Sequence, residues 1–176
     1  MTADPFPLTG RKVMLNPFTP EDLTDDYIGW LNDPIVTRFS NQRFVRHDRA
    51  SCERYLASFE GTPNLFFSIR QLEDGRPIGT MTAYVSPQHG TADVGILVGD
   101  RSAWGGGYGL DAWNTLTDWL AAQPGMRKIT CGTLARNEPM VHVAERSGMT
   151  IEARRRAQEL VDGEPVDMLY FARFVE

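Results

Sequence analysis

Apolar and polar residues alternate in several segments of this chain, which is the pattern of strands with one buried face. The predicted strands lie at residues 12–18, 65–71, 77–85, 92–98, 128–134, 151–161 and 166–175. Turn sequences at 73–76 and 86–90 join the second, third and fourth of these strands, which predicts an antiparallel meander. Asp162-Gly163 is a hairpin signal between the last two strands.

Apolar residues at helical spacing predict four helices between these strands. The predicted helices cover residues 19–32, 48–61, 110–120 and 137–147. The first opens on Thr19-Pro20, an N-cap residue followed by a proline at the first helical position. Parallel neighbours need a connection of a helix's length, so we expect the parallel pair within residues 92–134. The order β-α-α-β-β-β-α-β-α-β-β predicts an α/β fold (α+β mixed sheet), with a twisted, mostly antiparallel sheet of about seven strands and flanking helices.

Length and composition fit one domain spanning residues 1–176, because 176 residues with 41% hydrophobic content can bury a single sizeable core. The formal charge of −5 argues against a nucleic-acid-binding surface. Cys52 and Cys131 are far apart and in no metal-ligand spacing, which favours a reducing compartment and no metal site. Residues 1–10 do not have the pattern of a signal peptide, and no apolar run reaches the ~18 residues of a membrane span. We therefore expect a cytoplasmic protein with no membrane or nucleic-acid partner.

A glycine-rich segment, Trp104-Gly105-Gly106-Gly107-Tyr108-Gly109, lies between a predicted strand and a predicted helix. Glycines leave backbone N–H groups uncovered, and the N-terminus of the next helix adds its positive dipole end, so the segment can hold a pyrophosphate. A flexible turn before a helix explains the glycines equally well. A Walker loop is excluded because Gly109 is followed by Leu110-Asp111. A dinucleotide fingerprint is a weaker alternative, because only 64 residues follow Ala112.

Three blocks of the sequence resemble the GNAT superfamily of N-acetyltransferases. Residues 101–112 are similar to the family's Arg/Gln-x-x-Gly-x-Gly/Ala acetyl-CoA signature, with Trp104 at the Arg/Gln position as in the branch that includes ribosomal-protein N-terminal acetyltransferases. Residues 137–149 resemble the family's Asn-x-x-Ser…Glu-x-x-Gly-Phe helix, and residues 160–170 resemble the closing hairpin of the same branch. The order of elements also matches, so the resemblance covers essentially the whole chain. It implies an acetyl-CoA-dependent enzyme that acetylates a primary amine.

The resemblance also implies where the cofactor lies. Ile96, Leu97 and Val98 would pair with the pantetheine arm through their backbone. The backbone N–H groups of the glycine segment would hold the pyrophosphate, and these residues are Trp104, Gly105, Gly106, Gly107, Tyr108 and Gly109. Asn137 would reach the cofactor from the next strand–helix junction, although asparagine is equally a good helix N-cap.

The resemblance leaves the catalytic groups less defined. Asp93 is similar to an acidic position on the fourth strand that would serve as the general base, although a solvated residue or an ion pair explains it as well. Many relatives use a tyrosine in the helix after Asn137 as the general acid that protonates the CoA thiolate. In this chain that position is Ala144, so this general acid is missing. We expect Cys131 to be buried and His142 to lie at the surface.

The substrate side is expected between the first two helices and the final hairpin. Residues 27–44 resemble a segment of GNAT enzymes that acetylate amino sugars, and within it we single out Trp30, Arg38, Asn41 and Arg43. Trp30 also fits a core position, and the arginines suit either a sugar-nucleotide phosphate or plain solvent. Three hypotheses stay open: a small-amine acetyltransferase with an amino sugar or sugar nucleotide as substrate, a protein α-amine acetyltransferase, and a catalytically silent acyl-CoA-binding domain. Family members are often dimers, which makes a homodimer a further expectation.

Overall fold

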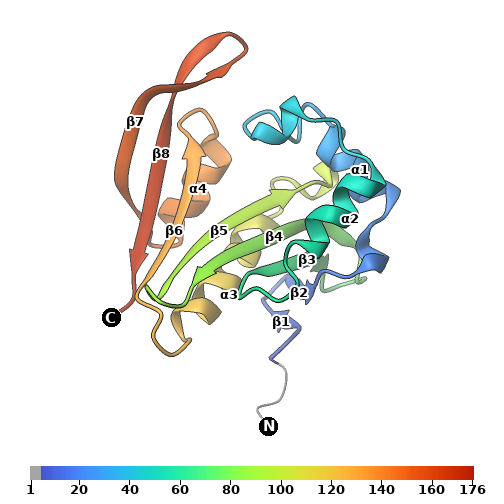
Figure 1. Cartoon of the computed structure of the whole chain (residues 1–176), viewed down its shortest axis with the longest axis horizontal. Helices are drawn as coiled ribbons and strands as arrows, with labels where there is room; N and C mark the ends of the chain where they lie inside the picture. Colours follow the sequence, from blue (N-terminus) through green and yellow to red (C-terminus); the bar gives the residue numbers. More distant parts are fainter. Residues whose placement is uncertain (1–4) are drawn as a thin grey trace.

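The computed structural model describes residues 5–176, which form an eight-stranded sheet with helices on both faces (Figure 1). The strand order is β1-β2-β3-β4-β5-β6-β8-β7, and every neighbouring pair is antiparallel except the parallel pair β5–β6. The strands are β1 Leu8–Thr9, β2 Val13–Pro17, β3 Leu65–Gln71, β4 Pro77–Ser86, β5 Thr91–Val98, β6 Lys128–Leu134, β7 Thr150–Val161 and β8 Glu164–Phe174. The helices are α1 Asp25–Asn32, α2 Arg49–Ala57, α3 Tyr108–Ala121 and α4 Glu138–Arg146, with 3₁₀ turns at Pro20–Asp22, Asn41–Phe44 and Arg101–Ala103.

The predicted order of strands and helices is confirmed, with one strand more than the seven expected. The additional strand, β1, has two residues and pairs with Leu15 and Met14 of β2. Two residues are too short to show an alternating pattern, so the sequence could not reveal it. Residues 1–4, part of the N-terminal segment interpreted above, lie outside the described residues.

The first helix begins later than predicted. Thr19-Pro20 opens only a 3₁₀ turn, in which the Asp22 carboxylate accepts the Thr19 N–H (2.9 Å) and a hydrogen bond from Arg70 Nη2 of β3 (2.6 Å). Asp22 is thereby fixed to the sheet and buried. A second cap, Thr24, then accepts the N–H of Tyr27 and starts α1 at Asp25.

Each face of the sheet has its own apolar cluster. Phe66 and Phe67 are neighbours on β3 and therefore point to opposite faces. Phe67 belongs to the main core, where α3 buries Trp113, Leu116 and other apolar side chains against the strands. Phe66 belongs to a smaller aromatic cluster under α1 and α2. On this second face α1 and α2 lie to one side and the β7–β8 hairpin to the other, with β5 and β6 between them (Figure 1).

The β7–β8 hairpin extends beyond the rest of the sheet (Figure 1). Nearly every residue of β7 is exposed, including Ile151 and Leu160, and β7 forms the last strand of the sheet. A register shift between Arg155 and Glu159, with Ala157 at φ 48°, bends it. A free edge of this kind is a surface on which a second chain can pair. The homodimer expected from the family stays a prediction, and this edge is where we place it.

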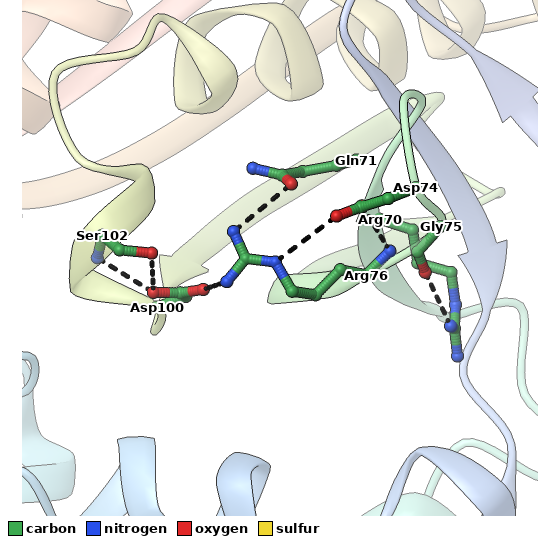
Figure 2. A network of polar contacts seen from close by, with 7 residues as sticks. All are labelled: Arg70, Gln71, Asp74, Gly75, Arg76, Asp100 and Ser102. Carbon is green, nitrogen blue, oxygen red and sulfur yellow. Dashed lines mark hydrogen bonds and ion pairs between the residues drawn. The ribbon is translucent and has the colours of Figure 1, made fainter.

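A polar network fixes the chain just before the glycine segment (Figure 2). The guanidinium of Arg76, in the β3–β4 turn, forms an ion pair with Asp100 and donates to Gln71 Oε1 (3.3 Å). Asp100 in turn accepts the backbone N–H and the hydroxyl of Ser102 at 2.9 and 2.6 Å. The end of β5 and the 3₁₀ turn after it are thus joined to a hairpin turn on the other side of β4.

Asp100→Asn should lower stability more at neutral pH than in acid. Burial alone would raise the pKa of Asp100, but hydrogen bonds from Ser102 and the charge of Arg76 outweigh it and lower the pKa. A lowered pKa means that this carboxylate stabilises the fold above its unfolded pKa of about 3.9, and that the contribution is lost as pH falls through the folded pKa. We expect the variant to lose about 1 kcal/mol at pH 7 and less than that at pH 3 relative to wild type, measured by urea unfolding. Glu73→Gln, in the neighbouring turn, is the control; equal losses at both pH values would contradict the prediction.

Candidate active site

The parallel strands β5 and β6 pair only at their beginnings. The paired residues are Thr91 with Lys128, Ala92 with Ile129 and Asp93 with Thr130. Beyond Asp93 the strands part, and a cavity of about 930 Å³ lies between Val94–Val98 and Gly132–Leu134. Residues 94–98 keep their pairing with β4 on the other side. The β5 edge that faces the cavity therefore has no strand partner there, and its backbone before Val98 can pair with an extended ligand.

The glycine segment forms one end of this cavity. Trp104, Gly105, Gly107, Tyr108 and Gly109 line it. Gly107 is the N-cap of α3 at φ 79°, in the left-handed region that favours glycine, and no side chain caps the helix there. The first N–H groups of α3 thus keep the positive end of the helix dipole without a side-chain partner. This arrangement suits a pyrophosphate, and it follows directly from the predicted motif.

Trp104 has a defined place at the side of the cavity. Its indole Nε1 donates a hydrogen bond to the carbonyl of Val98 (2.8 Å), and 46% of the residue is exposed. The ring therefore connects the end of β5 to the glycine segment. Ile96, Leu97 and Val98 all line the cavity, and the Val98 carbonyl already has a partner within the chain. Their pairing with the pantetheine arm stays a prediction.

Asn137 stands at the opposite wall, at the N-terminus of α4. It lines the cavity, and its side chain makes no capping hydrogen bond to the helix. The side-chain cap considered for Asn137 is therefore not formed, and its role toward the cofactor stays a prediction. His142, one turn further along α4, is exposed as expected and also lines the cavity. Ala144 is fully buried.

Asp93 is the last paired residue before the strands part. Its Oδ1 accepts a hydrogen bond from the Thr130 hydroxyl across the strand pair (2.6 Å). Although Asp93 is an exposed residue, the protein atoms around its carboxyl raise the pKa by burial, which outweighs the lowering by Thr130. The side chain is not among those lining the cavity but lies at the strand position next to it.

Tyr84 of β4 stands directly opposite Asp93 in the β4–β5 register. Its hydroxyl is 2.8 Å from the hydroxyl of Tyr55 on α2, and its ring is close to Phe59. An aromatic group therefore borders Asp93 on the side of α2. Cys131, which follows Thr130 on β6, is buried, and burial raises the pKa of its thiol to about 12. At neutral pH this thiol is protonated, in keeping with the structural role expected of it.

Of the four predicted substrate residues, two line the cavity and two do not. Arg38 and Asn41 line the cavity, and Arg38 forms an ion pair with Asp162 in the β7–β8 turn (2.9 Å). Arg43 donates to the carbonyls of Leu160 (2.9 Å) and Ser40. These contacts attach the 35–44 segment to the end of the hairpin.

Trp30 lies away from the cavity lining and packs against Gly99. A Cβ built on Gly99 would lie 2.2 Å from Cδ2 of the Trp30 ring, so only glycine permits this approach. Trp30 also meets Tyr27 edge-on, with ring centroids 6.5 Å apart. Its position therefore agrees with the core role considered for it.

Sequence reasoning missed several lining residues. Phe39 and Ile35 belong to the segment already singled out, whereas Glu159 and Met168 come from the hairpin. The hairpin was expected to form a wall, but the register shift before Glu159 decides which of its side chains face the cavity. No motif in the sequence marks that shift.

Within residues 5–176, no group of three His, Cys, Asp or Glu side chains is arranged to hold a metal ion. None of the helices in this described part is long and apolar enough to cross a membrane.

The fold brings a parted strand pair and the uncapped N-terminus of a helix to one cavity. A family model described as an acetyltransferase (GNAT) domain matches residues 12–150, and the chain belongs to this family. It is thus an acetyl-CoA-dependent N-acetyltransferase, as the sequence resemblance implied. No curated protein matches the chain.

Solved structures share the fold at low sequence identity. An acetyltransferase (GNAT family) from Bacillus anthracis has a TM-score of 0.80 at 15% identity, covering 95% of this chain and 97% of that one. RimL, a ribosomal L7/L12 α-N-protein acetyltransferase solved in complex with coenzyme A, has a TM-score of 0.79 at 14% identity, covering 96% and 97%. A spermidine N-acetyltransferase from Vibrio cholerae, in complex with CoA and spermine, has a TM-score of 0.81 at 15% identity, covering 93% and 96%. These structures support the fold, and two of them contain CoA.

Proposed function

We propose that this enzyme transfers the acetyl group of acetyl-CoA to the primary amine of a small molecule, with amino sugars as the leading class. The observation that carries the proposal is the parting of β5 and β6 directly after Asp93. Asp93 comes one residue before the unpaired edge of β5, and that edge and the glycine segment both line the cavity. Acetyl-CoA supplies the activated acetyl group as a thioester when it is bound.

The residues present fit that cofactor. The free edge of β5 at Ile96 would take the pantetheine arm, whereas the Leu97 carbonyl is turned toward Gly79 of β4. The N–H groups from Gly105 to Gly109 would hold the pyrophosphate. Asn137, with its side chain uncommitted to the helix cap, would contact the cofactor from α4.

Asp93 would accept the proton of the attacking amine, directly or through water. A primary amine with a pKa near 10.4 costs about 4–5 kcal/mol to hold neutral at pH 7, so the reaction needs a base. Burial raises the pKa of Asp93 toward the operating pH, which makes it a better proton acceptor than an ordinary carboxylate. Ala144 of α4 cannot act as a general acid. None is required, because a CoA thiol with a pKa near 8.5 leaves as the thiolate at a cost of only about 2 kcal/mol at pH 7.

The attachment of the 35–44 segment to the hairpin supports a small acceptor. Arg38 and Arg43 hold this segment across the cavity through Asp162 and Leu160. A cavity bordered by the 35–44 segment and the hairpin suits a small molecule better than a protein terminus, which needs an open groove. Both arginines have partners in the chain, but these contacts are solvent-exposed and weak, so an amino sugar and a sugar nucleotide both stay in the proposal.

The test is acetyl-CoA-dependent thiol release with a panel of amines, including amino sugars, sugar nucleotides, polyamines, aminoglycosides and peptide N-termini. We expect turnover with small amines and none with peptides, and acetyl-CoA binding by calorimetry in the same samples. Turnover confined to peptide N-termini would replace the proposal by protein α-amine acetylation. Tight acetyl-CoA binding without turnover on any amine would favour the silent binding domain.

A further inference from the structure

The turn between β1 and β2 is fixed to the first turn of α3. The Asp111 carboxylate accepts the backbone N–H groups of Arg11, Lys12 and Val13 at 3.1, 2.7 and 3.1 Å. The backbone of this turn comes so close to α3 at Gly10 that a Cβ there would lie only 2.5 Å from the Asp111 carboxylate. This turn is far from the glycine segment in sequence, yet it is held beside it in space.

From this turn the side chain of Lys12 reaches the glycine segment. Its ammonium donates a hydrogen bond to the carbonyl of Gly106 (2.7 Å) and lies 5.7 Å from the ring centroid of Tyr108. It is also 3.6 Å from the position that a Cβ on Gly107 would occupy. Neither Lys12 nor Gly106 lines the cavity, so the bond is made on the outer side of the segment.

Lys12 gives the glycine segment a hydrogen bond and a positive charge, and the segment has use for both. Three consecutive glycines have a large backbone entropy, and a hydrogen bond to the central carbonyl restricts it before any ligand arrives. The segment has no cationic side chain of its own, because Trp104 stands where the signature has Arg or Gln. The nearby Arg101 faces Asp33, at 3.7 Å.

We propose that Lys12 is a positioning residue for the pyrophosphate of acetyl-CoA. It holds the Gly106 carbonyl outward, which keeps the N–H groups of residues 107–109 directed to the cavity, and it adds a positive charge beside the N-terminus of α3. The inference rests on the proposed assignment of this segment as the pyrophosphate site. The site thereby includes a residue from outside the family's signature, contributed by the start of the chain.

Calorimetry with CoA tests the proposal on three variants. Lys12→Met should weaken CoA binding about tenfold, the size of one hydrogen bond to a charged group. Lys12→Arg should retain affinity within about threefold, because a guanidinium can donate to the same carbonyl. Arg11→Met is the matched control: it removes a charge from the same turn and retains the backbone hydrogen bond to Asp111, so its affinity should equal that of wild type. In turnover, Lys12→Met should raise KM for acetyl-CoA without changing kcat.

Pantetheine, which lacks the pyrophosphate, separates this role from a structural one. Lys12→Met should bind pantetheine as wild type does, at an unchanged melting temperature. Wild-type affinity of Lys12→Met for CoA would overturn the proposal, and so would an equal loss for CoA and pantetheine. If wild type itself binds CoA no more tightly than pantetheine, the assignment of the pyrophosphate site fails, and the inference with it.

Discussion

Asp93→Asn should lower kcat on the order of 10²–10³-fold with little change in KM for acetyl-CoA. The amide cannot accept the proton of the amine, and positioned proton transfer contributes about 10²–10⁴-fold in enzymes. The substitution preserves size and can still accept the hydrogen bond of Thr130. Steady-state kinetics on the best amine of the panel gives the result, with Glu73→Gln as a remote control. Unchanged kcat in Asp93→Asn would remove Asp93 from the mechanism.

Stability distinguishes catalysis from a structural role for the same residue. A carboxyl whose folded pKa is raised destabilises the fold once it is ionised, above both pKa values, and this cost disappears in acid. Asp93→Asn should therefore be at least as stable as wild type at pH 7. A structural ion pair would give the opposite sign.

The pH profile follows from the same carboxyl. In wild type, kcat/KM should fall as pH decreases through the raised pKa of Asp93. Thr130→Val removes the hydrogen bond that lowers this pKa, so its acid limb should move to higher pH. Asp93→Asn should show no such limb.

The fold was predictable because its signals are local. Alternation over five or more residues gave seven of the strands, and the turns at 73–76 and 86–90 gave the meander. Contacts between distant residues account for the differences. The late start of α1 depends on Arg70, 48 residues from Asp22, and two-residue β1 exists only because β2 pairs with it.

In the candidate site, too, the residues that a local motif marks were predictable, and those that depend on distant contacts were not. The glycine segment, the 96–98 strand and Asn137 are motif residues, and the fold brings them to one cavity. The partners of Arg38 and Arg43 lie 124 and 117 residues further along the chain, in a hairpin whose register no local pattern fixes. The contact of Lys12 with Gly106 could not be predicted either, because the two residues are 94 positions apart in the sequence.

Gly107→Val should weaken CoA binding about 100-fold. At φ 79° a residue with a Cβ is strained by about 1–2 kcal/mol, and a β-branched side chain by more. The chain can relieve this strain by rotating the peptide units around residue 107. That rotation turns N–H groups away from the cavity, and the loss of two hydrogen bonds to a charged group gives a factor of this size.

Gly61→Val separates backbone strain from loss of the site. Gly61 has a φ of 68° and no atom within 4 Å of a built Cβ, and it is not among the residues lining the cavity. The two variants should therefore lose similar stability in thermal unfolding, while only Gly107→Val loses affinity for CoA in calorimetry. Because both positions require the same left-handed backbone, any difference in CoA binding belongs to the N-terminus of α3. Equal, wild-type affinity in both variants would show that the pyrophosphate lies elsewhere, since a displaced glycine segment could not leave its binding unchanged.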